Sequence, residues 1–217
     1  MLTLVCFALK EEAAPFRKMA AGKSDVSILL VGIGRLNAEK SVRDFLAANS
    51  PGLVLTCGFA GGLNPDLKIG DVVFDISAED KTKPPYVSSY QALVAAGAKW
   101  VTFFCADRIA ITVAEKTKLH AETGADVVEM ESAAVQAVCR ERGIPCVTIR
   151  VISDTAEEDL PLDFNALSKP DKSLDFAKLA GAIIRSPGKI GALMALQKKT
   201  SFAASQLAGV LGKIISP

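Results

Sequence analysis

Short runs of β-branched and other apolar residues recur along the chain and predict strands buried within a sheet. They cover residues 2–8, 26–31, 53–57, 72–76, 100–105 and 146–152. Between several of them, apolar residues recur at helical spacing. This predicts a helix carrying Phe16 and Met19, one from about 38 to 47 and one from about Ser132 to Arg142. Such alternation of strands and helices is typical of a single α/β domain.

The stretch from Asp126 to Asp154 combines a strand, a helix and a second strand. The first strand runs into Glu129 and Glu131, and the second ends at Ser153 and Asp154. This unit is expected to place Glu131 and Asp154 at the carboxyl-end side of one parallel sheet, where open α/β folds bind ligands. Each also has a purely structural explanation. Acidic residues are favoured at a helix start, and Ser followed by Asp is a common turn or capping sequence.

Glycines gather after two of the predicted strands. The run Gly58, Phe59, Ala60, Gly61, Gly62 is expected to form a loop whose backbone approaches a ligand closely and presents N–H groups to it. A turn without a ligand is the alternative. The GIG segment at residues 32–34 lacks the third glycine of a dinucleotide-binding fingerprint, so a tight turn explains it adequately.

Composition narrows the class of function. A chain of 217 residues, half of them hydrophobic, with a net charge of +1, forms one well-buried domain and offers no basic field for nucleic acid. It contains neither an uninterrupted apolar run long enough to span a membrane nor a signal-peptide pattern, so a cytoplasmic protein is expected. Five cysteines without C-x-x-C spacing suit reduced core thiols, and the lone His120 offers no Ser-His-Asp triad. Neither a metal nor a cofactor is expected.

The segments VVEMESAAVQAVC and VTIRVISDTAEED resemble the signature region of the nucleoside phosphorylase and methylthioadenosine/S-adenosylhomocysteine nucleosidase superfamily. ALKEE near the start, GIG at residues 32–34 and GFAGGLNPDLKIGDVV from Gly58 extend the resemblance, in order, over residues 1 to about 185. It implies a three-layer α/β/α domain around a central twisted sheet that is mixed and largely parallel.

The resemblance also implies a role for each of three carboxylates. Glu131 would hold the ribose hydroxyls, Asp154 would protonate the purine and Glu12 would activate the attacking water. Asp154 would have to carry a proton, and burial among apolar side chains at a strand end would favour the protonated form, with Ser153 close enough to orient it. The other substrate-binding positions that the resemblance implies are Met130, which would pack on the sugar, Ile33, Gly58, Phe59, Ala60, Gly61 and Ile109, with Arg108 in place of Ile109 if the correspondence shifts by one residue.

Two departures from the family pattern bear on the acceptor of the sugar. Phosphorylases of this family carry an arginine and a serine for phosphate where this chain has Thr56 and Phe59, which favours water as the acceptor. Arg35 or Arg108 could restore a cation. The polar segment 77–89 is also shorter than the family's substrate-covering region.

We therefore expect hydrolysis of the N-glycosidic bond of an adenine-type purine nucleoside, with phosphorolysis of the same substrate class as the close alternative. A catalytically silent nucleoside-binding protein is an alternative of another class. The presence of all three carboxylates in one chain argues against it.

The resemblance fades after about Arg185, so residues 186–217 are expected to form a basic extension to the domain of residues 1–185. From Arg185 onward the chain has no acidic residue and five basic ones. Two amphipathic helices are predicted, one over residues 190–194 and one over residues 203–214. They either pack on the domain or on a partner subunit, or lie on an anionic membrane surface.

This tail and the segment ISDTAEEDLPLDF resemble the hopanoid-biosynthesis branch of the superfamily, whose nucleoside substrate carries a large lipid. Peripheral contact with the inner membrane would suit such a substrate. Because the sites of the family commonly borrow residues across a subunit contact, a homodimer or larger closed assembly is expected.

Overall fold

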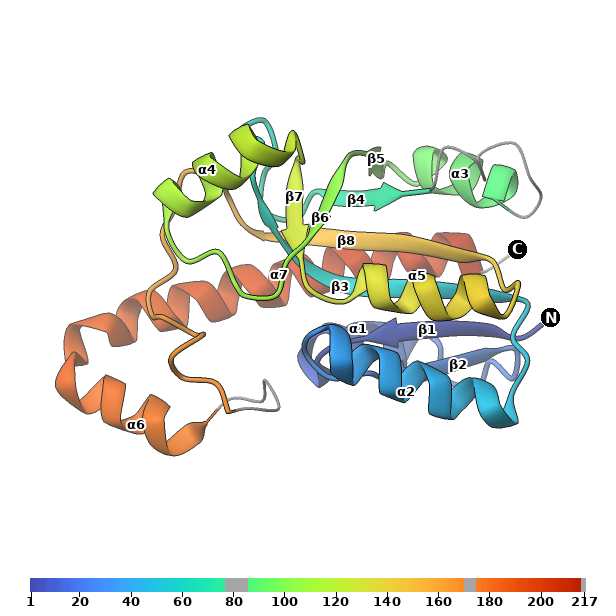
Figure 1. Ribbon diagram of the computed structural model, residues 1–217, viewed down its shortest axis with the longest axis horizontal. Coiled ribbons are helices and arrows are strands. Elements are labelled where there is room, and N and C mark those ends of the chain that lie inside the picture. The colour runs from blue at the N-terminus through green and yellow to red at the C-terminus, as the bar shows by residue number, and fades with distance from the viewer. Residues whose placement is uncertain (77–85, 170–174, 216–217) are drawn as a thin grey trace.

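The strands of one sheet run through the centre of the molecule (Figure 1). The computed structural model describes residues 1–76, 86–169 and 175–215. Within them the strands are β1 (Thr3–Phe7), β2 (Val26–Leu30), β3 (Leu53–Gly62), β4 (Val72–Asp75), β5 (Lys99–Trp100), β6 (Phe103–Cys105), β7 (Val127–Glu129) and β8 (Cys146–Asp154). Their order is β2-β1-β3-β8-β4-β5, with β7 paired to β3 and β6 to β7.

The direction of the strands confirms the predicted sheet. β1 is parallel to both β2 and β3, and β3 is parallel to β8. β4 is antiparallel to β8, and β7 is antiparallel to β3. The sheet is therefore mixed and largely parallel.

Helices cover both faces of this sheet. α2 (Arg35–Ala48) and α5 (Ser132–Glu141) lie together on one face, while α1 (Lys10–Met19), α3 (Tyr86–Ala95) and the second half of α7 (Ile190–Ile215) lie on the other (Figure 1). Alternate residues of β1 belong to the two cores. Leu4 and Cys6 pack with the first pair of helices, and Val5 and Phe7 pack with the second group. This is the expected three-layer arrangement.

Two short strands replace the single strand predicted at residues 100–105. β5 pairs with β4, whereas β6 pairs with β7. Between them, the N–H and hydroxyl of Thr102 donate to the Asp126 carboxylate at 2.9 and 2.8 Å. These bonds lie where the chain leaves β5, beside β4, and enters β6, beside β7. The apolar pattern of residues 100–105 does not predict them.

The loop predicted at residues 58–62 is also wrong, because β3 continues to Gly62. It pairs with β8 as far as Gly61 opposite Asp154, after a shift in register between Ala60 and Gly61. The end of β3 also pairs with β7, which is antiparallel to it instead of lying parallel beside β8 as expected. The glycine run is thus strand backbone that pairs with β8 from Gly58 to Gly61 and with β7 at Gly61 and Gly62.

The tail is made of α6 (Phe176–Arg185), a 3-10 turn (Pro187–Lys189) and α7. Two helices were predicted after Pro187, but α7 is continuous over 26 residues. Its second half is buried, with Leu207 and Leu211 both at 0% exposure, whereas α6 and the first half of α7 extend away from the sheet (Figure 1). Across the described ranges, no helix by itself has the length and apolar character to cross a membrane. α6 and the helix after it, bent by 106°, meet that criterion only as a pair.

Candidate active site

Glu12 lies in the first turn of α1 and is held by two backbone segments. Leu9 N–H donates to its Oε2 at 2.8 Å, and Phe59 N–H donates to its Oε1 at 2.9 Å. Burial raises the pKa of Glu12, and the two N–H groups offset only part of this rise. A Cβ atom on Gly58 would lie 2.8 Å from Glu12 Oε1, so the glycine, at φ +152°, is what lets β3 approach the carboxylate.

Arg150, from the middle of β8, is the centre of a buried ionic cluster. Its Nη2 lies 2.7 Å from Glu129 Oε2, 3.7 Å from Glu131 Oε2 and 3.2 Å from Thr56 Oγ1. Glu129 also accepts the hydroxyl of Ser132 at 2.6 Å. Burial alone would raise the pKa of Glu129, but Arg150 and the hydrogen bonds at the start of α5 lower it overall.

Glu131 is the residue just before α5 and is 7% exposed. Its Oε1 accepts a hydrogen bond of 2.8 Å from Gly34 N–H, which explains the GIG turn: Gly34, at φ +85°, directs its amide toward the carboxylate. Burial raises the pKa of Glu131 to about 7, because the repulsion from Glu129 adds to desolvation while Arg150 opposes both. Of the two neighbouring glutamates, Glu131 is therefore the one that titrates near neutral pH.

Asp154 ends β8 and is 7% exposed. Its Oδ1 accepts the hydroxyl of Ser153 at 2.8 Å, as expected from their adjacency. The expectation of purely apolar surroundings is wrong, because Lys116 Nζ lies 2.6 Å from Asp154 Oδ2. The space beside the carboxylate is tight. A Cβ atom on Gly61 would lie 3.2 Å from Oδ2.

Two of the three carboxylates, those of Glu12 and Asp154, lie along β3. Glu12 lies against Gly58 and Asp154 lies against Gly61, three residues further on, which is about 10 Å along an extended strand. Glu12 and Glu131 both feel the charge of Arg150. The structure thus places Glu12 and Asp154 against one strand and Glu131 beside Arg150 of the neighbouring strand, and Met130, 8% exposed, lies in the chain between Glu129 and Glu131.

The other predicted substrate-binding residues, Ile109, Arg108 and Ile33, form hydrogen bonds or an ion pair within the protein. Ile109 N–H donates to Asn165 Oδ1 at 2.9 Å, and Ile109 C=O accepts from Asn165 Nδ2 at 2.9 Å. Arg108 pairs with Glu115 in α4 (Val113–Thr123). Ile33 is half-buried, and its carbonyl accepts a hydrogen bond of 2.8 Å from the Asn37 side chain.

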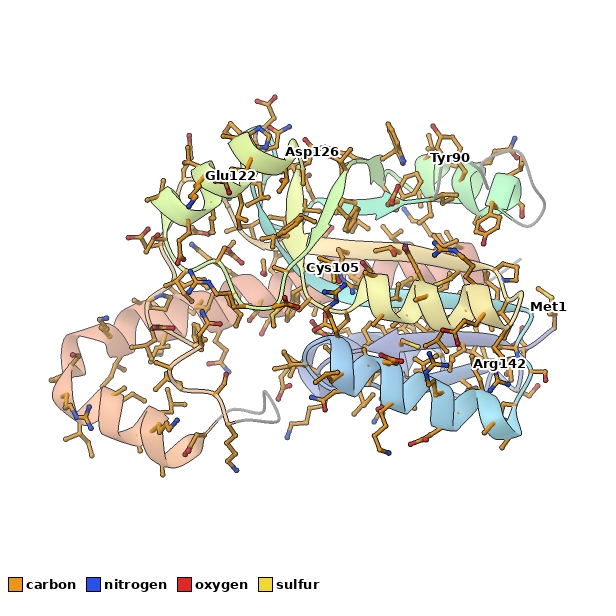
Figure 2. All side chains as sticks on the ribbon, in the orientation of Figure 1. Met1, Tyr90, Cys105, Glu122, Asp126 and Arg142 are labelled. Atoms are coloured by element: carbon orange, nitrogen blue, oxygen red, sulfur yellow. The ribbon has the colours of Figure 1, made fainter. Side chains whose placement is uncertain are left out.

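An open pocket of about 750 Å³ lies beside α4 and β6, and its lining includes Arg108 and Ala110 on either side of Ile109. Its lining includes Arg35, Cys105 and Glu122, and Figure 2 shows Cys105 near the middle of the molecule and Glu122 on α4. None of Glu12, Glu131 and Asp154 lines it. The pocket nevertheless adjoins the Glu131 side of the candidate site, because Arg35 in its lining follows Gly34, whose N–H binds Glu131.

Two charged residues of the site were missed by sequence reasoning. Arg150 had a signal, because a charge inside a strand that is apolar on both faces must find a buried partner. Lys116 had none. It lies in the polar segment KTKLHAET, where nothing distinguishes it from the exposed Lys118 two residues later.

The family model described as the phosphorylase superfamily matches residues 8–96 and 90–185. The 5'-methylthioadenosine/S-adenosylhomocysteine nucleosidase of Shewanella halifaxensis is 29% identical over 174 residues, which are 67% of this chain and 74% of that protein. The corresponding nucleosidase of a Marinomonas species gives the same identity and coverage.

Solved structures resemble the whole chain. Futalosine hydrolase of Helicobacter pylori superposes with a TM-score of 0.70 at 19% identity, covering 99% of this chain and 97% of that one. The H. pylori 5'-methylthioadenosine/S-adenosylhomocysteine nucleosidase with butyl-thio-DADMe-Immucillin-A gives a TM-score of 0.70 at 20% identity, with coverages of 99% and 98%. At these identities the likeness establishes a shared fold, and it includes the tail.

Proposed function

Because this chain belongs to the phosphorylase superfamily, we propose that it hydrolyses the N-glycosidic bond of an adenine-type nucleoside and releases the base. The observation that carries the proposal is the placement of Glu12 and Asp154 along the glycine-rich end of β3, with Glu131 beside Arg150, whose charge also acts on Glu12. The nucleosidases similar to this chain support the same substrate class.

Each carboxylate meets a charge that develops as the bond breaks. Asp154 transfers a proton to a ring nitrogen of the leaving purine, which gains negative charge, while the sugar acquires oxocarbenium character. Glu131, in its ionised form, accepts hydrogen bonds from the ribose hydroxyls. Glu12 takes a proton from water as the hydroxide adds to the anomeric carbon, so the proton lost by Asp154 is balanced by the one gained at Glu12.

Three features support water as the acceptor. The Phe59 N–H is already bound to Glu12, and the Thr56 hydroxyl accepts a hydrogen bond from Arg150. Arg35 and Arg108, the two cations considered for a phosphate site, pair with Asp107 and Glu115. At positions 56 and 59, where phosphorylases of the family bind phosphate, this chain thus has neither the arginine nor the serine, and the groups present already have partners within the protein.

The test is base release from 5'-methylthioadenosine and adenosine, with and without inorganic phosphate. Free sugar in both conditions supports hydrolysis, and a sugar phosphate formed only with phosphate would support a phosphorylase. Asp154→Asn is expected to reduce turnover by about 10²-fold to 10⁴-fold with nucleoside binding retained. Asp44→Asn, which removes an exposed carboxylate on α2, is the matched control. Equal and negligible turnover in all three proteins would instead favour the silent nucleoside-binding protein.

We further propose that the arm formed by α6 and the first half of α7 touches an anionic membrane surface, which would bring a lipid-linked adenosyl substrate within reach. Ile184, Ile190 and Met194 on this arm are 80%, 45% and 56% exposed. Residues 176–217 contain no acidic residue, so basic side chains accompany the exposed apolar ones without internal neutralisation.

Co-sedimentation with vesicles containing an anionic lipid tests this second proposal. A truncation at residue 185 would also remove the buried half of α7, so substitution is the better design. The combined variant Ile184→Ser, Ile190→Ser, Met194→Ser is expected to lose binding. Val94→Ser, on the exposed side of α3, is expected to keep it. Equal partitioning of the two variants would contradict membrane contact and leave the arm as a surface for another partner.

A homo-oligomer is proposed as well. Several large apolar side chains lie on the surface of the single chain, including Leu36, which is 82% exposed at the start of α2. A closed assembly would cover such residues.

A further inference from the structure

Lys116 is 0% exposed to solvent, although an ammonium group without a partner is costly to remove from water. Its side chain comes from α4 and reaches the loop that follows β8. The ammonium lies 2.6 Å from Asp154 Oδ2, 2.7 Å from Thr155 C=O and 2.9 Å from Glu158 C=O. An ammonium has three N–H donors, and all three are used. This is a fully formed site for one charged group.

Contacts from two elements hold the Asp154 carboxylate. Ser153 donates to Oδ1 and Lys116 donates to Oδ2, so both oxygens of the carboxylate are held, each with a lone pair left for a further partner. The two carbonyl contacts tie the chain immediately after Asp154 to the same ammonium. The orientation of the carboxylate is therefore set jointly by Ser153 of its own strand and by Lys116 of α4.

Resting on the proposed function, we propose that Lys116 is a positioning residue that holds the Asp154 carboxyl group and the following loop in the geometry required for proton transfer to the base. It does not touch the substrate. The proton passes from the Asp154 carboxyl group to the ring nitrogen, and the carboxylate that this leaves is the form that the Lys116 ammonium and the Ser153 hydroxyl bind in place.

A second lysine allows two possible roles of Lys116 to be distinguished, namely holding the carboxylate and holding the loop. Lys199 of α7 pairs with the Glu158 carboxylate, and Glu158 Oε1 accepts from Thr155 N–H at 3.0 Å. Lys199 thus supports the loop without an ion pair to Asp154. If Lys116 acted only by anchoring this loop, loss of either lysine would have the same consequence.

The experiment measures adenine release from 5'-methylthioadenosine by full-length Lys116→Met, Lys199→Met and Lys118→Met. Lys118 is the matched control, because it lies on the same helix with a side chain that is 73% exposed. Lys116→Met is expected to lower kcat by about 10-fold or more, up to the loss caused by removing the acid itself, with a smaller change in KM. Lys199→Met and Lys118→Met are expected to stay close to the unsubstituted protein.

A double-mutant cycle with Asp154→Asn gives the decisive readout. If Lys116 acts through Asp154, adding Lys116→Met to Asp154→Asn causes little further loss of kcat. Lys116→Gln, which keeps one donor for the loop carbonyls, takes the place of Lys116→Met if that variant does not fold. A full additional loss in the cycle, equal loss in Lys199→Met, or a Lys116 variant as active as Lys118→Met would overturn the inference while leaving the proposed function intact. Failure of the unsubstituted chain to release any base would overturn both.

Discussion

Arg150 is a charged residue in the buried interior of the sheet. The side chain is 1% exposed, and it meets Glu129 and Glu131 where water cannot compensate for a missing partner. Its Nε has no hydrogen-bond partner among the described groups, so the guanidinium is oriented entirely by its outer nitrogens. Arg150 therefore stabilises the fold and also influences the charge of both glutamates.

Arg150→Met is therefore expected to destabilise the protein by about 3–5 kcal/mol, because it leaves Glu129 buried without its cation. Urea denaturation measures the change. The double variant Arg150→Met, Glu129→Gln is expected to recover part of the loss, since the unpaired charge is removed. Lys40→Met, which breaks an exposed pair with Asp44, is the control with a much smaller effect. A loss for Arg150→Met no larger than the control would show that the cluster is not tightly coupled.

Glu131 is expected to make stability depend on pH. Its folded-state pKa of about 7 lies above the ordinary value of 4.5, so between these values the folded protein binds more protons than the unfolded chain. The stabilisation associated with the protonated, buried carboxyl is fully present below the ordinary pKa and is lost as pH rises through about 7.

Chemical denaturation of the unsubstituted protein and Glu131→Gln from acidic to alkaline pH checks this. The stability of the unsubstituted protein relative to the variant is expected to fall between about pH 4.5 and 7 and to level off above. Glu11→Gln, the substitution of an exposed carboxyl in the same turn as Glu12, is the control for a generic loss of negative charge. A difference that stays flat over the same interval would contradict the raised pKa.

At the scale of elements, β3 is the strand that brings the site together. It pairs with β1, β7 and β8, and so it meets the elements that carry or precede Glu12, Glu131 and Asp154. Its glycines are required for this proximity, since a side chain at Gly58 or Gly61 would enter the space that a carboxylate occupies. The strand is thus both the middle of the sheet and one wall of the candidate site.

α7 joins two regions with different surroundings. Leu207 belongs to the core between the sheet and α1, whereas Met194 is 56% exposed on the extended half of the same helix. Leu207→Ala is therefore expected to cost about 2–5 kcal/mol of unfolding free energy, because it opens a cavity in packed surroundings. Met194→Ala is expected to cost far less. Thermal or urea unfolding of the two variants gives the comparison, and similar small losses would mean that the second half of α7 is not part of the cooperative core.

At the scale of the whole molecule, a mass measurement tests the predicted assembly state. We expect a homodimer or larger closed assembly at micromolar concentration, because exposed apolar residues such as Leu36 gain from mutual burial. Light scattering coupled to gel filtration measures the mass directly. A monomer mass over that concentration range would contradict the expectation and would require the site to be complete within one chain.

The sequence by itself determined most of the elements and the residues of the proposed chemistry. Apolar periodicity, glycine stops and β-branched runs are local signals, so they located β1, β2, β8 and α5, together with Glu131 before α5 and Asp154 at the end of β8. The resemblance to a family supplied the three-layer fold and the proposed roles of Glu12, Glu131 and Asp154. The errors lie where a segment's conformation depends on its neighbours: the extension of β3, the direction of β7 and the continuity of α7.

Only the tertiary structure decided which groups face one another. Glu12 meets Phe59 across 47 positions and Glu131 meets Gly34 across 97, separations at which sequence spacing carries no geometric information. Lys116 shows the limit most clearly, because a lysine in a polar helical segment has the same local pattern whether it is solvated or buried against Asp154. Its role depends on how α4 packs on the end of β8, and the low dielectric of that contact is a property of the folded molecule alone.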